Sequence, residues 1–199
     1  TSANHSATHI LHQALREVLG THVAQKGSAV HSKHLRFDFS HFSKLTVDEL
    51  RDVENFVNAR IEGKLPLIEK RAIPKEEAIA DGAMSLFGEK YGDTVRSIRF
   101  GQSVELCGGT HVERTGDIGS FKIIEESSLS SGVRRIVAVT GLKSILQMQQ
   151  NESTLSDLQS VLKTPPRDML ERINTLLKDK KELERKLRSK ARIRSEICI

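Results

Sequence analysis

Two pairs of residues of metal-binding type, far apart in the sequence, most constrain how this chain can fold. The first pair is His5 and His9 in the stretch HSATH, and the second is Cys107 and His111 in CGGTH. Residues four apart on a helix share one face, so the two histidines can both reach one cation. The two glycines after the cysteine permit a sharp turn that brings the second pair together. One ion bound by all four would bring the start of the chain against a segment in its second half.

The chemistry of these four side chains favours zinc. Cys thiolate and His imidazole are preferred zinc ligands, and four of them complete a tetrahedral shell. HSATH lacks the glutamate of the HExxH protease motif, so it contains no general base. The alternative interpretation is a solvated histidine pair, together with a buried cysteine beside a structural Gly-Gly turn. His12 is a fifth candidate ligand, although we expect it to be solvated or to support another ligand.

An amphipathic helix at the start of the chain is the clearest predicted element. Gly20 fits its end. At about 100° per residue, the three histidines fall on the side opposite the apolar stripe, so we expect them to lie outside the core. The stripe follows the i, i+3, i+4 pattern of a helix with one buried face. It consists of Ala7, Ile10, Leu11, Ala14, Leu15, Val18 and Leu19.

The remainder of residues 1–141 mixes helical and strand patterns, which predicts an α+β domain with an antiparallel sheet and packed helices. We expect a turn around Gln25 to Ser28, and a helix over 45–63 that starts with a capping box. Thr46 and Glu49 form that box, and Pro74 fits the first turn of a short helix. The predicted strands cover 34–40, 65–73, 94–101, 103–109, 119–127 and 132–141.

The pattern changes after Gly141, and residues 142–199 are predicted to form a helical hairpin or a coiled-coil arm. Pro165-Pro166 separates two helices, and the second has apolar residues at roughly seven-residue spacing. The formal net charge of +5 also lies there, because residues 167–199 hold eleven Lys or Arg against six Asp or Glu. This asymmetry hints at a polyanionic partner, although packing or solvation of a charged helix is the commoner explanation. The arm could also mediate self-association.

Composition excludes several classes of function. Aromatic residues make up only 4% of the chain, which argues against recognition of bases by stacking. Cys107 and Cys198 are too few and too far apart for a disulfide framework, which favours the reducing cytoplasm. No signal peptide or long apolar run is present, so we expect no membrane insertion.

Three stretches together resemble the editing domain of alanyl-tRNA synthetases. They are NHSATHILHQALREVLGTHVAQKGSAV, LRFDFSH and ELCGGTHVERTGDIGSFKIIEES, the last followed by GVRRIVAVTG. The resemblance covers about residues 1–141 and continues more loosely into the helical arm. Free-standing deacylases of misacylated alanine tRNA share the motifs, and the editing domain of threonyl-tRNA synthetase is a more distant relative. The stretch GAMSLFGEKYGDTVR resembles the full-length synthetase.

This resemblance implies a fold, an activity and a set of site residues. The fold is that of the second additional domain of threonyl- and alanyl-tRNA synthetases, and the activity is hydrolysis of Ser-tRNA(Ala) and Gly-tRNA(Ala). The partner is the acceptor end of tRNA(Ala), and one zinc ion is bound per chain. The implied metal ligands are His5, His9, Cys107 and His111. The implied catalytic residues are Cys107 and Gln25, and the implied substrate-binding residues are Thr8, Gln25, Ser28 and Arg134.

Selectivity for serine has a physical basis in these residues. A site that hydrogen-bonds the serine hydroxyl leaves buried polar groups unpaired when alanine enters. Thr8 stands between the two histidines, and Gln25 can both donate and accept. The alternatives are a helix hydroxyl bonded to its own backbone and an ordinary turn residue. Arg134 and Arg135 are expected on opposite faces of a strand, with Arg134 toward the site.

Four protein ligands pose a mechanistic question, because closed tetrahedral zinc sites are usually structural. The rival hypothesis is therefore a tRNA-docking module held together by zinc and inactive in isolation. The aminoacylation domain and the globular C-terminal domain of the family are missing here, so we expect neither useful ATP binding nor tRNA charging. A start five residues before a metal ligand suggests a cut rather than a natural terminus.

Overall fold

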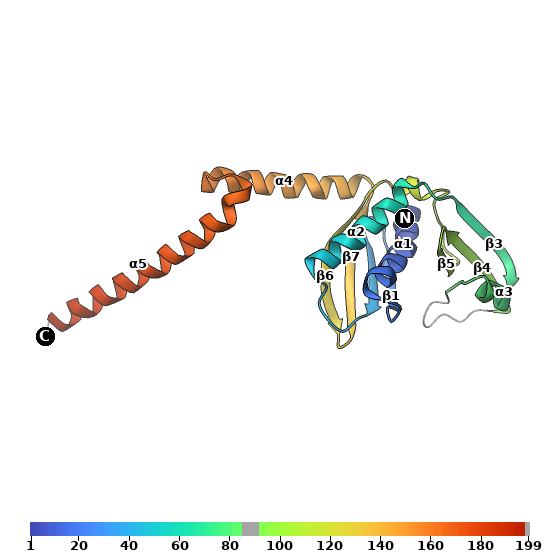
Figure 1. Ribbon diagram of the computed structural model, residues 1–199, viewed down its shortest axis with the longest axis horizontal. Coiled ribbons are helices and arrows are strands. Elements are labelled where there is room, and N and C mark those ends of the chain that lie inside the picture. The colour runs from blue at the N-terminus through green and yellow to red at the C-terminus, as the bar shows by residue number, and fades with distance from the viewer. Residues whose placement is uncertain (85–91, 198–199) are drawn as a thin grey trace. The chain divides into compact units, whose positions relative to one another are not determined.

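The computed structural model describes residues 1–84 and 92–197, without the side chains of 190–197. It divides into two compact units, Thr1–Gln147 and Met148–Ile199. The stretch GAMSLFGEKYGDTVR, residues 82–96, therefore lies partly outside the described residues, and Cys198 lies outside them. Figure 1 shows the elements in chain order. They are α1 (Ser2–Leu19), β1 (Gln25–Val30), β2 (Leu35–Ser40), α2 (Val47–Glu62), β3 (Leu67–Pro74), α3 (Lys75–Ala80), β4 (Thr94–Phe100), β5 (Ser103–Leu106), η1 (Thr115–Ile118), β6 (Phe121–Ser130), β7 (Val133–Thr140), α4 (Leu142–Leu162), η2 (Pro166–Asp168) and α5 (Met169–Ile197).

The first unit contains two antiparallel sheets, which confirms the predicted α+β class. Four strands run in the order β1-β2-β7-β6, and three run in the order β3-β4-β5. Helices α1 and α2 pack on each other and against the larger sheet, as Figure 1 shows. Alternate residues of its strands face these helices, so Phe37, Phe39 and Ile136 are fully buried in one core with Leu11 and Leu15.

Several local predictions are confirmed at residue level. Gly20 is the C-cap of α1, and its φ of 112° lies in the region that favours glycine. Thr46 and Glu49 form the expected capping box at the start of α2. The Oγ of Thr46 accepts from the N–H of Glu49 at 3.1 Å, and the Thr46 N–H donates to the Glu49 carboxylate at 2.7 Å.

The predicted turn over residues 25–28 is wrong, because these residues begin strand β1. The error lies at Gly27, which the sequence pattern marks as a turn residue but which here occupies an irregularity in strand pairing. The register between β1 and β2 shifts between Gln25 and Gly27. A Cβ at Gly27 would lie 3.3 Å from a carboxylate oxygen of Asp38 on the neighbouring strand. The glycine therefore permits close strand packing instead of a chain reversal.

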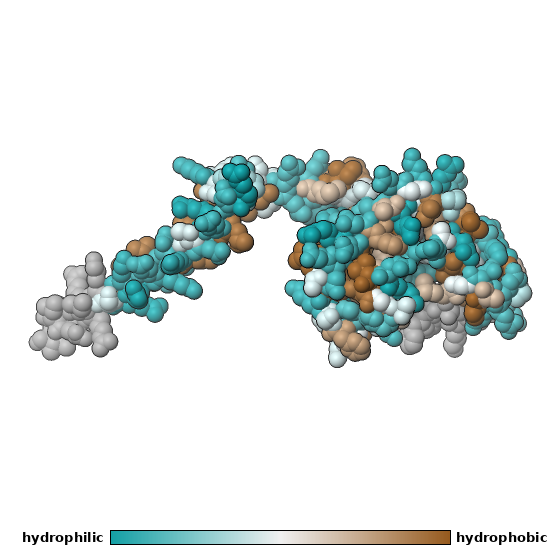
Figure 2. Space-filling model, viewed as in Figure 1, coloured by the Kyte–Doolittle hydropathy of each residue, from teal (hydrophilic) through white to brown (hydrophobic). Residues whose placement is uncertain are grey.

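The second unit contains the end of α4 and all of α5. Both helices leave large apolar side chains exposed, visible as brown patches among teal in Figure 2. Among them are Leu155, Leu158, Leu170, Leu183 and Leu187. The helical hairpin or coiled-coil arm and its self-association remain predictions. None of the helices among the described residues combines the length and apolarity needed to cross a membrane.

Candidate metal centre

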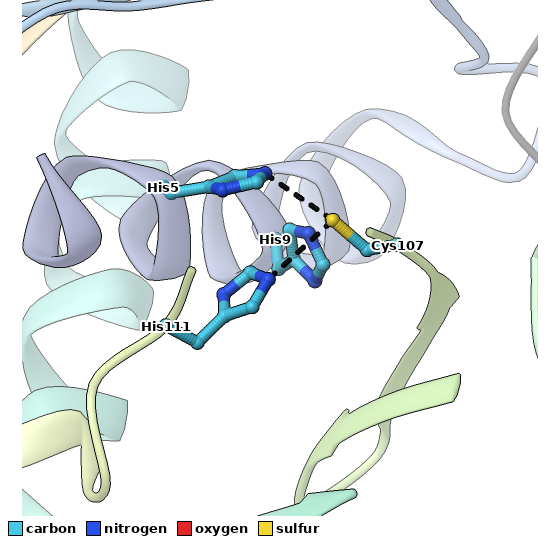
Figure 3. A group of neighbouring side chains, drawn as sticks. All are labelled: His5, His9, Cys107 and His111. Atoms are coloured by element: carbon cyan, nitrogen blue, oxygen red, sulfur yellow. Dashed lines mark hydrogen bonds between the residues drawn. The ribbon is translucent and has the colours of Figure 1, made fainter. Parts of the chain in front are cut away.

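The structure brings the two distant pairs of metal-binding residues together. His5 and His9 project from α1, and Cys107 and His111 lie in the loop after β5 (Figure 3). One ligand atom from each residue lies within 4.8 Å of all the others. The Sγ of Cys107 is 3.3 Å from Nε2 of His5 and 3.4 Å from Nε2 of His111. This group of four side chains, hereafter the HHCH cluster, could hold a metal ion.

The loop that carries Cys107 and His111 is fixed by an arginine on the adjacent strand. The guanidinium of Arg96 donates to the carbonyl oxygen of Cys107 at 3.1 Å and to that of Gly109. Its Nε donates to the carboxylate of Glu69 at 2.5 Å. The Cys107 N–H in turn donates to the Arg96 carbonyl at 3.0 Å. These bonds fix the turn between Cys107 and His111, so the two ligands converge.

Each of the two half-buried histidines has a hydrogen-bond partner in addition to the sulfur of Cys107. The ring of His111 places Nδ1 3.1 Å from Oγ of Ser6, which also accepts from the N–H of Val112 at 3.1 Å. The ring of His5 is hydrogen-bonded to the backbone of Thr110. Such outer partners set the tautomer of a ligating histidine and leave its other nitrogen for a metal.

Two of the three histidines of α1 are buried, so the prediction that all three lie outside the core is wrong for His9 and His12. His9 is 2% exposed and His12 is 4% exposed, because β5 covers the side of α1 that faces away from the apolar stripe. Between them lies Glu105, whose carboxylate is 2.8 Å from Nδ1 of His12 and 3.5 Å from Nε2 of His9. Nδ1 of His9 is buried and has no hydrogen-bond partner in the part of the chain that the structure describes.

Burial keeps the histidines of the HHCH cluster neutral. Desolvation, aided by the neighbouring His9, lowers the pKa of His5 from 6.5 to about 4 and that of His111 to about 3. Desolvation also lowers the pKa of His9. Burial works against ionisation of Glu105, but the adjacent His9 and His12 lower its carboxyl pKa below the ordinary value. Neutral imidazole is the form that binds metals.

The donor set of the HHCH cluster fits a metal ion on structural grounds. Three neutral imidazoles and one thiol converge on one point, and the unpartnered Nδ1 of His9 belongs to a ring in this group. A buried polar atom without a partner is costly unless an unseen group satisfies it. Nitrogen and sulfur donors in fourfold number are compatible with zinc.

The metal-free chain is expected to lose free energy of unfolding as the pH falls from 6.5 to about 4. The unfolded chain protonates its histidines near a pKa of 6.5, whereas folded His5 and His111 do so only near pKa values of about 4 and about 3. The unfolded state therefore binds more protons in this window, and stability is complete only above it. Urea unfolding across this range should show a shallower pH dependence for His111→Gln than for the parent. Equal slopes would contradict the prediction.

The predicted substrate residue Thr8 is buried in α1. Its hydroxyl donates to the carbonyl oxygen of Asn4 at 2.9 Å, which is the backbone bond weighed as the alternative to a recognition role. The hydroxyl oxygen keeps its capacity to accept a further hydrogen bond. Its role in substrate recognition remains a prediction.

The other three predicted substrate residues lie on the four-stranded sheet. Gln25 and Ser28 are on β1, where the amide of Gln25 donates to the Ser28 hydroxyl at 3.4 Å. Arg134 on β7 is 12% exposed and its Nε donates to Glu126 at 2.6 Å. Arg135 pairs instead with Asp38, which agrees with the expected opposite faces of the two arginines. The HHCH cluster contains none of these residues, and their roles remain predictions.

Three residues that support the HHCH cluster were absent from the sequence prediction. Glu105 could have been found, because it stands two positions before Cys107 as the one charged residue of the predicted strand 103–109. Ser6 lies between the two histidines but gives no signal, since most helix serines are solvated. Arg96 is one of many arginines, and only the folded chain shows that it holds the loop after β5.

The comparisons with known proteins agree with this geometry. Residues 95–137 match the family described as the threonyl and alanyl tRNA synthetase second additional domain. The chain is 55% identical over 189 residues to an alanine–tRNA ligase of Christiangramia forsetii, covering 95% of this chain and 22% of that protein. It is 54% identical over 196 residues to that of Flavobacterium psychrophilum, covering 96% and 22%.

The alanine–tRNA ligase of Bacteroides fragilis is 59% identical over 165 residues, which is 83% of this chain and 19% of that protein. The chain thus spans about a fifth of the length of the curated relatives it matches. The family match includes Cys107 and His111, the second pair of the HHCH cluster. The chain therefore belongs to the alanyl-tRNA synthetase family, as a segment homologous to part of an alanine–tRNA ligase.

Proposed function

We propose that this chain hydrolyses the ester bond of misacylated Ser-tRNA(Ala) and Gly-tRNA(Ala), with one zinc ion bound by His5, His9, Cys107 and His111. The convergence of these four side chains is the observation that carries the proposal. Family membership supports the choice of tRNA as partner, because the curated relatives are alanine–tRNA ligases. The chain would act in the cytoplasm, as the editing part of such an enzyme.

Access to the HHCH cluster is open on one side. His5 and His111 are half-buried, whereas Gly108 and Thr110 between the second pair are exposed. The 3′ end of a tRNA would therefore approach over the loop after β5, away from the buried His9. Bound zinc would supply activation of water, polarisation of the ester carbonyl, or a hold on the amino group of the substrate.

The chain's own residues would provide selection. Thr8 can accept a hydrogen bond from a serine hydroxyl while it donates to Asn4, and Gln25 can both donate and accept. Alanine has no hydroxyl to make these additional bonds, so it would bind less well in the reactive position. Ser28 and Arg134 complete the proposed pocket, Arg134 from within its ion pair with Glu126.

A second function rests on the number of ligands. Four protein ligands make a closed shell, which is typical of structural zinc, so the chain could instead be a tRNA-docking module without activity. The two functions share the metal and the partner, and they differ only in whether the ester is cleaved.

Deacylation of purified Ser-tRNA(Ala) and Ala-tRNA(Ala) by the zinc-loaded chain tests the proposal. We expect hydrolysis of the serine ester at least about 100-fold faster than that of the alanine ester, because a site that hydrogen-bonds a hydroxyl can reject an analogue without it by about 10⁴–10⁵-fold. Removal of zinc with a chelator should abolish the activity, and added zinc should restore it. Circular dichroism follows folding throughout. Bound zinc and bound tRNA without hydrolysis above the spontaneous rate would favour the docking module.

A further inference from the structure

A buried carboxylate beside the HHCH cluster has no role in the proposed chemistry. We propose that Glu105 is a positioning residue that holds the ring of His9 with its Nε2–H toward the carboxylate and its Nδ1 toward the metal. This inference rests on the proposed zinc site. It adds a residue that supports the metal ligand His9 and is not itself a metal ligand.

The geometry around His9 gives the direction of its ring. Nε2 lies 3.5 Å from Oε2 of Glu105, and both side chains are 2% exposed. A nitrogen that faces a carboxylate carries the proton, since two acceptors would repel each other. The remaining nitrogen, Nδ1, is buried and has no hydrogen-bond partner among the described residues, as expected for an atom kept for a metal ion. His111 follows the same logic with the opposite nitrogen, because its Nδ1 lies 3.1 Å from Oγ of Ser6.

His12 holds the other oxygen of the same carboxylate. Its Nδ1 lies 2.8 Å from Oε1 of Glu105, and the side chain is buried in α1 one turn beyond His9. His12 therefore hydrogen-bonds one oxygen of the carboxylate, while the other oxygen faces His9 at 3.5 Å. The bond to His12 keeps Glu105 beside His9 and explains the third histidine of the sequence without making it a ligand.

The cost of this arrangement supports a function for it. A buried carboxylate is destabilising unless it is paired and hydrogen-bonded, and hydrophobic residues of similar size often serve stability better. Glu105 is 1% exposed, so its carboxylate is removed from water in the folded chain. Outer partners of ligating histidines commonly change metal affinity by 10–100-fold.

Zinc affinity of Glu105→Gln, measured by competition with a chromogenic chelator, tests the inference on the full chain. We expect a loss of about 10–100-fold, because the amide places an N–H₂ where one histidine needs an acceptor. Glu126→Gln is the matched control, since it changes another buried carboxylate of the same chain, outside the HHCH cluster. It should bind zinc as the parent does. An affinity of folded Glu105→Gln within twofold of the parent would overturn the inference.

Nitrogen-15 NMR of the histidine rings in the zinc-free parent gives a second readout that needs no variant to fold. We expect His9 as the Nε2–H tautomer and His111 as the Nδ1–H tautomer. A His9 ring protonated at Nδ1 would overturn the inference. If the parent binds no zinc yet shows the expected tautomers, the proposed function fails and the positioning by Glu105 stands.

Discussion

Gly109→Ala is expected to abolish zinc binding while the chain stays folded. A Cβ at Gly109 would lie 2.0 Å from Cε1 and 2.4 Å from Nδ1 of His5, distances at which something must move. The ring of His5 is the end of a side chain that can rotate, so the clash is relieved by moving the ring and not the backbone. That movement takes Nε2 out of the HHCH cluster and breaks the bond between the ring and Thr110.

Gly108→Ala is the matched control for this prediction. A Cβ at Gly108 would meet no atom within 4 Å, so the same substitution one residue earlier should leave zinc affinity unchanged. Neither glycine has a positive φ, and backbone strain is therefore equal in the two variants. The loss at Gly109 should exceed the 10–100-fold typical of an outer partner, because a ligand is displaced. Isothermal titration measures the zinc affinity of each variant, and thermal unfolding shows whether each variant stays folded. Equal affinities of the two variants would show that His5 is no ligand.

Much of the fold was predictable because the local sequence patterns determine the local backbone geometry. The capping box at Thr46 and Glu49 is a contact between neighbours in sequence, and Gly20 ends α1 for a local reason. The HHCH cluster was predictable for the same reason, since the members of each pair are only four positions apart and their chemistry is unusual. Only the contact between the two pairs is long-range in sequence. It could be expected because all four side chains are of types that bind the same metal.

The burial of His9 and His12 was not predictable from helical periodicity. One apolar stripe indicates one buried face, and it cannot reveal that β5 packs against the polar face as well. That second interface is made of paired polar groups, Glu105 with the histidines, so it lacks a hydrophobic signal. The misassigned turn at Gly27 has a similar origin, because glycine serves close strand approach and chain reversal equally well.

Cys107→Ala is expected to remove zinc and to reduce deacylation of Ser-tRNA(Ala) to the spontaneous rate. Cys107 is the one residue of the HHCH cluster that can supply a negative charge, since the other three are imidazoles kept neutral by burial. Without the thiolate, three neutral nitrogens face a divalent ion. Cys107→Ser should fail equally, because a hydroxyl stays protonated where a metal-bound thiol does not.

The loss in Cys107→Ala should come from the site and not from unfolding. Cys107 follows β5 at the edge of a small core with Ile98 and Phe100, and the bonds from Arg96 to the loop use backbone atoms that alanine retains. Cys198→Ala is the control, because it removes the other cysteine of the chain. Cobalt-loaded parent and control should show thiolate-to-metal absorption, and Cys107→Ala should not. Retained zinc with lost hydrolysis would instead make the sulfur a participant in the reaction, whereas retained hydrolysis would remove Cys107 from the site.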